Sequence, residues 1–203
     1  IQASKIQYRL LYKHKVNQFI PNAVKVDPKY KKLVSNNQAV KTILFVGRLT
    51  AQKNWQCLIN ALPEVIKESP GIQVVVCGDG EDKTDFIALV TKLGLDENIV
   101  WRGYEKNIYQ VMKDADALVL PSWYEGMPNV FLEALEVGLP CIVSKIDANM
   151  TLLNNKKAAL LFDPSKPHEL TVQLRKFLAT VEHRAMINEG WELASNYTAK
   201  QLA

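Results

Sequence analysis

The stretch ALVLPSWYEGMPNVFLEALEVGLPCIVS, residues 117–144, decides the fold. It begins with the apolar run ALVLPS at 117–122 and ends with CIVS at 141–144. The segment between them, PNVFLEALEVG at 128–138, has apolar residues at helical spacing and a closing glycine, Gly138, which predicts a helix. Two short apolar runs joined by a helix are typical of parallel strands in one sheet.

The same alternation extends over most of the chain. We predict further strands at 42–47, 72–78, 98–104 and 158–162, and further helices at 54–68, 82–93, 108–115, 148–154 and 168–181. Strands that are apolar on both faces favour a parallel sheet covered by helices on each side. The predicted fold is therefore α/β, a doubly wound Rossmann-like parallel sheet.

Composition fits an ordinary globular protein rather than a membrane span. The chain has 203 residues, of which 48% are hydrophobic and 23% charged, and its net charge is +4. Its apolar runs are too short to cross a bilayer, and the amino terminus lacks the apolar core of a signal peptide. Cys57, Cys77 and Cys141 lie in apolar contexts without metal-ligand spacing, so we expect reduced core thiols in a cytoplasmic protein.

The chain divides into three parts. Residues 41–181 carry the alternating pattern, whereas 1–40 have the turn signals of a linker. Residues 182–203 predict one more helix, broken near Gly190 or Asn196. The missing initiator Met indicates a fragment, and both ends could belong with a neighbouring domain.

The first strand-to-helix loop, VGRLTAQKN at 46–54, has the chemistry of a diphosphate site. Ligands of open parallel sheets bind at the carboxyl ends of the strands. Gly47 ends a strand there, and Arg48 and Lys53 bracket the turn before a helix, so the two cations could grip phosphate oxygens. The alternative is a solvated loop with two surface cations.

A second loop, CGDGEDK at 77–83, lacks the third glycine of the dinucleotide fingerprint. We therefore expect Gly78 to serve a tight turn, which could lie close to a ligand, rather than an oxidoreductase site. No P-loop pattern is present either, which disfavours an ATPase or a kinase.

The third loop leads into the helix at 128–138. Pro128 suits a first helical turn, and Met127 cannot cap, so we expect the amides of Asn129 and Val130 to be open to an outside acceptor such as phosphate. Glu133 lies on the same helix face as Asn129.

The two glutamates of this stretch have different settings. The helix around Glu133 is apolar nearly all round, so this carboxylate should line a cleft, where it could accept two hydroxyl hydrogen bonds from a ribose diol. The alternatives are an exposed Glu133 beside Glu136, and a Glu125 that only neutralises the helix dipole.

Taken together, these residues resemble the large family of retaining glycosyltransferases of GT-B architecture that carry an E-x7-E element. The resemblance covers roughly residues 18–181. Its matching elements are IPNAV (20–24), VGRLTAQKN (46–54), CGDG (77–80), RGY (102–104), the segment 114–144 and ALLFDPSKPHEL (159–170). IPNAV departs from the family pattern, which usually has glycine in place of Ala23.

The resemblance implies a role for each candidate residue. Arg48 and Lys53 would hold the diphosphate of a UDP- or GDP-linked sugar and stabilise it as it leaves, without a divalent metal. Glu133 would bind the ribose, and Glu125, with the backbone of Gly126 and Met127, would contact the transferred sugar. The base would lie near Arg102, Gly103, Tyr104 and Gly78. Asp114 and Asp116 spell D-x-D, the metal motif of another transferase architecture, but their position predicts caps or turns.

The resemblance also implies that this chain is the carboxy-terminal, donor-binding half of a two-domain enzyme. A glycan or lipid-linked acceptor would bind mainly to the other domain, and no nucleic-acid partner is expected. The basic segment 8–15 would pack on that domain or touch an anionic membrane. His14, His168 and His183 match no family role and should be surface residues. Two alternatives remain, a GT-B epimerase and a non-catalytic nucleotide-sugar-binding or regulatory domain.

Overall fold

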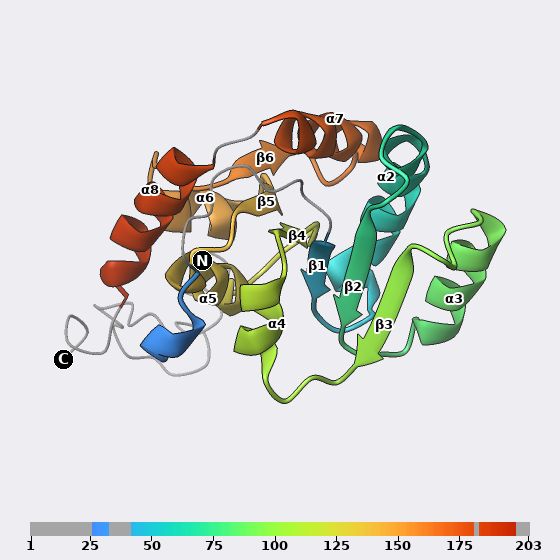
Figure 1. Cartoon of the computed structure of the whole chain (residues 1–203), viewed down its shortest axis with the longest axis horizontal. Helices are drawn as coiled ribbons and strands as arrows, with labels where there is room; N and C mark the ends of the chain where they lie inside the picture. The colour runs from blue at the N-terminus through green and yellow to red at the C-terminus, as the bar shows by residue number, and fades with distance from the viewer. Residues whose placement is uncertain (1–25, 33–41, 181–182, 198–203) are drawn as a thin grey trace, which may run out of the picture.

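One six-stranded sheet forms the centre of the molecule (Figure 1). The computed structural model describes residues 26–32, 42–180 and 183–197. Neighbouring strands pair in parallel in the order β3-β2-β1-β4-β5-β6. They are β1 (Thr42–Val46), β2 (Gln73–Cys77), β3 (Ile99–Gly103), β4 (Ala117–Leu120), β5 (Cys141–Ser144) and β6 (Leu160–Phe162). The predicted strands and the doubly wound α/β architecture are confirmed.

Helices follow the strands and cover both faces of the sheet. They are α2 (Trp55–Glu68), α3 (Lys83–Lys92), α4 (Ile108–Asp114), α5 (Asn129–Val137), α6 (Asp147–Leu153), α7 (Pro167–Ala179) and α8 (Arg184–Ser195). Two single turns, η1 (Pro28–Tyr30) and η2 (Ala51–Lys53), complete the described elements.

The core is divided by the sheet into two layers. In β1, Ile43 and Phe45 pack with α2, α3 and α7, whereas Leu44 packs with α4, α5, α6 and α8. Because successive strand residues point to opposite faces, each buried strand feeds both layers. This is why the central strands β1, β2 and β4 carry apolar residues on both faces.

Two glycines shape the packing of α5 and α8. Gly138 ends α5 with a φ of +83°, as predicted, and its amide donates to the carbonyl of Ala134 over 3.0 Å. The predicted break at Gly190 is wrong, because α8 continues through it to Ser195, next to the other predicted position, Asn196. A Cβ at Gly190 would lie 3.0 Å from Cδ2 of Leu135, so the glycine permits close approach of α8 to α5.

The segment 26–32 packs on the same side as α8. The amide of Lys32 donates to the carbonyl of Val137 over 2.8 Å, and Nζ of Lys113 donates to the carbonyl of Lys29 over 2.7 Å. The element IPNAV, the basic segment 8–15 and His14 lie outside the described residues. The three-part division of the chain stays a prediction.

Other expectations concern single residues. The three cysteines are free and buried, as predicted. His168 is exposed as predicted, whereas His183 stacks on Phe177 with ring centroids 3.9 Å apart, so the prediction of a surface His183 is wrong.

None of the described helices is long and apolar enough to cross a membrane.

Candidate functional site

The sheet brings the loops after β1, β2, β3 and β4 to one edge. Val46 pairs with Cys77, and Cys77 pairs with Gly103, so these strands end at the same level. β1 lies between β2 and β4, and the order of the strands reverses at this point. Such a switch point is where open α/β sheets bind ligands.

Lys53 and Glu125 form an ion pair between the β1 and β4 loops. Nζ of Lys53 lies 2.6 Å from Oε1 of Glu125, and the hydroxyl of Ser122 donates to the same oxygen over 2.7 Å. The two charged side chains are only 18% and 13% exposed. The structure therefore joins two predicted catalytic residues that are distant in sequence, and the pair is charge-assisted and partly shielded from water.

The stem of Lys53 lies against Gly47. A Cβ at Gly47 would be 3.3 Å from Cγ and Cδ of Lys53, so a side chain there would press on the lysine. The neighbouring Arg48 is exposed, and its side chain forms no ion pair with the described residues. The loop thus presents one cation held by a carboxylate and one cation facing solvent.

The β1 and β4 loops are clamped together by further hydrogen bonds. The amide of Trp123 donates to the carbonyl of Gln52 over 3.0 Å, and the side chain of Gln52 donates to the carbonyl of Tyr124 over 3.0 Å. Asn54 is 5% exposed and donates from Nδ2 to the carbonyls of Pro121 and Pro164, each over 3.0 Å. Its left-handed backbone, φ 49°, starts α2.

A buried network lies beneath the Ser122–Glu125 turn. The hydroxyl of Ser144 donates to the carbonyl of Ser122 over 2.7 Å, and Nδ2 of Asn149 donates to the carbonyl of Ser144 over 2.8 Å. All three side chains are buried. This network fixes the turn that carries Glu125, and sequence reasoning missed it because single Ser and Asn residues give no local signal.

Gly78 makes the tight turn predicted for it. Its φ is +146°, and a Cβ there would lie 1.9 Å from the carbonyl oxygen of Gly47. The amide of Gly78 donates to the carbonyl of Gly103 over 2.7 Å, and the indole of Trp101 donates to the carbonyl of Gly78 over 2.8 Å. The close approach thus joins the β2 turn to the β1 loop and the end of β3.

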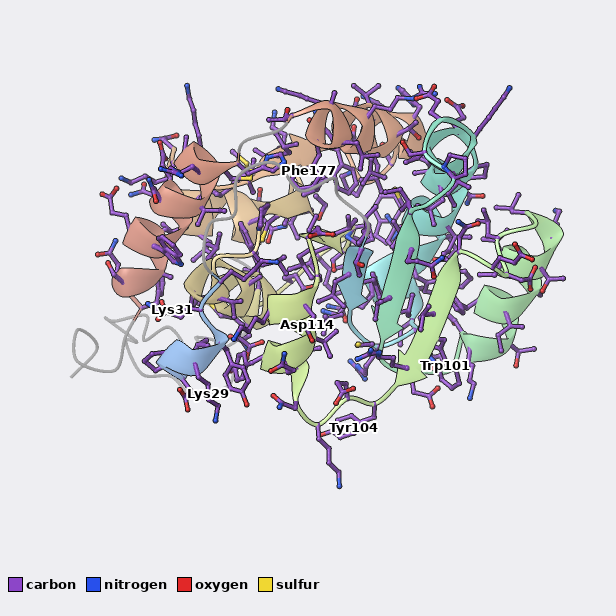
Figure 2. The ribbon with its side chains drawn as sticks, in the orientation of Figure 1. Lys29, Lys31, Trp101, Tyr104, Asp114 and Phe177 are labelled. Carbon is purple, nitrogen blue, oxygen red and sulfur yellow. The ribbon has the colours of Figure 1, made fainter. Side chains whose placement is uncertain are left out.

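The residues proposed to border the base follow at the end of β3. Gly103 has a φ of +63°, and Nη1 of the exposed Arg102 lies 3.9 Å from Oε2 of the half-buried Glu105. Tyr104 is 82% exposed and extends from the loop between β3 and α4 (Figure 2). Gly103 itself is buried, whereas Arg102 and Tyr104 on either side of it are exposed.

Glu133 lies in the second turn of α5 and is half-buried, so the alternative of an exposed residue is wrong. The hydroxyl of Tyr109 on α4 donates to its Oε1 over 3.3 Å. Burial raises the pKa of Glu133, and the hydrogen bond from Tyr109 opposes that rise. Burial, together with the nearby Glu133, raises the pKa of Tyr109 to about 12, so the phenol keeps its proton.

The beginning of α5 differs from the prediction. Pro128 occupies the cap position rather than the first turn, and the amide of Asn129 donates to the carbonyl of Met127 over 2.9 Å. The amide of Asn129 is therefore not open to an outside acceptor. The side chains of Met127 and Val130 pack against the core, whereas Gly126 is exposed with open space around its Cα.

The D-x-D residues lie at the end of α4 and just before β4, and their carboxylates have structural partners rather than the predicted cap or turn bonds. A carboxylate oxygen of Asp116 accepts the amide of Thr42 over 2.9 Å at the start of β1, and Asp114 accepts from the side chain of Gln110 over 2.9 Å. Figure 2 shows Asp114 on α4. Both carboxylates are thus engaged in holding the start of β1 and the end of α4.

Comparison with known proteins identifies the family of the chain. The family model described as "Glycosyl transferases group 1" matches residues 27–191. An Escherichia coli UDP-Gal:alpha-D-GlcNAc-diphosphoundecaprenol alpha-1,3-galactosyltransferase is 36% identical over 152 residues, which are 73% of this chain and 39% of that enzyme. The chain thus spans well under half the length of this curated relative.

Solved structures show the same fold. Sucrose-phosphate synthase from Thermosynechococcus elongatus has a TM-score of 0.81 at 21% identity and covers 99% of this chain and 53% of its own. Anabaena HepE in complex with UDP and glucose has a TM-score of 0.71 at 23% identity and covers 79% of this chain and 45% of its own. The fold is that of one half of a GT-B glycosyltransferase. The extent of the family match shows that the chain belongs to the group 1 glycosyl transferases.

Proposed function

We propose that this chain is the donor-binding half of a retaining hexosyltransferase that uses a nucleoside diphosphate sugar. The observation that carries the proposal is the Lys53–Glu125 pair, 2.6 Å long, at the switch point of the sheet with Arg48 on the same loop. A diphosphate offers Lys53 an alternative anionic partner, and its arrival would release Glu125 to accept hydroxyl hydrogen bonds from the transferred sugar.

Charge stabilisation is the proposed source of catalysis. As the bond between the anomeric carbon and the diphosphate breaks, its electron pair moves to the leaving phosphate. Arg48 and Lys53 would stabilise that growing negative charge. The acceptor hydroxyl oxygen would form the new bond on the face that the diphosphate leaves, and its proton would pass to the departing phosphate oxygen. In this proposal the protein's own cations perform the task that a divalent metal has in other transferases.

UDP is the nucleotide that we propose to test first. The Escherichia coli relative is named for UDP-galactose, and the Anabaena structure holds UDP and glucose. Glu133 would accept the ribose hydroxyls, and the surface formed by Gly78, Arg102, Gly103 and Tyr104 would border the base. The acceptor would be a glycan or a lipid-linked sugar, bound mainly by residues beyond this chain. The reaction would take place in the cytoplasm, at the membrane face for a lipid-linked acceptor.

Isothermal titration calorimetry of the chain with UDP and GDP tests the proposal. Arg48→Ala and Glu133→Ala should each weaken UDP binding about tenfold or more, because each removes charged hydrogen bonds. Arg175→Ala is the matched control, since Arg175 pairs with Glu64 and Glu68, and should bind as the unmodified chain does. Unchanged affinity in both site variants would contradict the proposed site. Sugar transfer by the full-length protein would separate an enzyme from a binding domain or an epimerase.

A further inference from the structure

A hydrogen bond between α4 and α5 links Tyr109 to Glu133. The phenol donates to Oε1 over 3.3 Å, and both side chains are partly buried. Tyr109 is the only side chain in the described part of the molecule that hydrogen bonds to this carboxylate. Since the carboxylate lies on one helix and its donor on another, the bond can hold Glu133 relative to the rest of the fold.

The ring of Tyr109 is itself held in place. It packs against the core layer of α4, α5 and α8, and the ring of Tyr30 lies 5.9 Å away at 35°. Tyr30 belongs to η1, and its segment is tied to the ends of α5 and α4 through Lys32 and Lys113. Figure 2 shows the neighbouring Lys29 and Lys31 on the same turn beside α4. Tyr109 is thus fixed from two sides.

The bond leaves most of the carboxylate free for a ligand. An ionised carboxylate has two oxygens and about four acceptor positions. Tyr109 occupies one position on Oε1, so Oε2 and the remaining position on Oε1 stay available for two neighbouring hydroxyls. Without a donor, the terminal torsion of a glutamate is broad, and the carboxylate would sample many orientations.

We propose that Tyr109 is a positioning residue, which holds the Glu133 carboxylate in the orientation that receives a vicinal diol of the ligand, and that Tyr30 braces its ring. This inference rests on the proposed function, in which Glu133 binds the ribose. Tyr109 touches no ligand in this scheme and acts through Glu133 alone.

The test compares two ligands, UDP and 2′,3′-dideoxy-UDP, by calorimetry on the 203-residue chain. Tyr109→Phe keeps the ring and its packing and removes only the hydroxyl. It should weaken the binding of UDP about three- to tenfold, the range expected for the loss of one hydrogen bond, and leave the binding of dideoxy-UDP unchanged. Tyr197→Phe is the matched control, since Tyr197 packs against the same core layer and should leave both affinities unchanged.

A double-mutant cycle with Glu133→Ala identifies the route of the effect. If Tyr109 acts through Glu133, the double variant Tyr109→Phe/Glu133→Ala binds UDP no more weakly than Glu133→Ala alone. Circular dichroism of each variant confirms that the fold is retained.

Each contrary result has a distinct meaning. If Glu133→Ala weakens UDP but Tyr109→Phe does not, the positioning role is overturned and the donor site stands. If Tyr109→Phe weakens the binding of both ligands equally, Tyr109 has only a structural effect and the inference is again overturned. If Glu133→Ala itself leaves UDP binding unchanged, the proposed ribose contact of Glu133 is contradicted, and the role of Tyr109 that depends on it is overturned as well.

Discussion

Nζ of Lys53 lies 2.6 Å from Oε1 of Glu125, and the two residues come from loops on either side of the switch point. The ammonium of Lys53 and the carboxylate of Glu125 therefore neutralise each other across the two loops. In the proposed function, a diphosphate that binds Lys53 would compete with Glu125 for the ammonium group, so binding of the donor would favour release of the carboxylate. This coupling links the fold to the proposed chemistry.

Breaking this pair should destabilise the fold. Lys53→Met leaves a partly buried carboxylate with Ser122 as its remaining donor, and we expect the free energy of unfolding to fall by about 1–3 kcal/mol. The double variant Lys53→Met/Glu125→Gln should recover most of the loss, because the uncompensated charge is gone. Urea unfolding measures both. Strictly additive effects of the two changes would show that the pair is not coupled.

The turn at Gly78 should not tolerate a side chain. Gly78→Ala places a Cβ 1.9 Å from the carbonyl oxygen of Gly47 at a φ of +146°, and we expect a loss of about 2 kcal/mol or more in stability. Gly71→Ala is the control, since a Cβ added there would meet no atom within 4 Å and its φ is not left-handed. Equal melting temperatures of the two variants would contradict the close packing of the β1 and β2 loops.

Asn54 combines a backbone role with a side-chain role, and two substitutions separate them. Asn54→Gly keeps easy access to the left-handed φ of 49° but loses the hydrogen bonds to Pro121 and Pro164. Asn54→Ala loses these hydrogen bonds and also the easy access to the left-handed φ. We expect Asn54→Ala to be the less stable by about 1 kcal/mol, the cost of a left-handed non-glycine residue. If the glycine variant is instead the less stable, backbone conformation has no weight at this position.

Much of the fold and part of the site could be predicted from the sequence. Strands such as β1 could be predicted because buried parallel strands are apolar on both faces. The topology then places Arg48, Lys53 and Glu125 at one edge of the sheet. The Lys53–Glu125 bond was not predicted, because it joins residues 72 positions apart and depends on how two loops meet. Of the two positions predicted for a break in the last helix, Asn196 agrees with the structure, whereas the helix continues through Gly190, which packs closely on Leu135.

The titration of Glu133 should affect binding and stability in opposite directions. Burial raises its pKa above the unfolded value of 4.5, so the folded chain binds this proton more tightly and the contribution to stability falls as pH rises through the raised pKa. UDP binding needs the ionised form and should be lost as pH falls through the same window. The facing titratable group is Tyr109 on α4, while Glu136 on α5 pairs with Lys31.

Glu133→Gln isolates this titration. It should raise the free energy of unfolding at neutral pH by about 0.5–2 kcal/mol and lower the affinity for UDP. Its difference from the unmodified chain in UDP affinity should shrink as pH falls through the raised pKa of Glu133, because Glu133 itself then becomes neutral. Glu136→Gln is the control on the same helix. An affinity difference that stays constant over this range would show that ionisation of Glu133 is not required.

A crystal structure of the chain with UDP-glucose tests the central claim most directly. The account predicts the diphosphate within hydrogen-bond distance of Arg48 and Lys53, the ribose hydroxyls on Glu133, and Glu125 turned from Lys53 towards the glucose. A nucleotide bound elsewhere, or one bound here with the Lys53–Glu125 pair intact and Glu133 out of reach of the ribose, would contradict it.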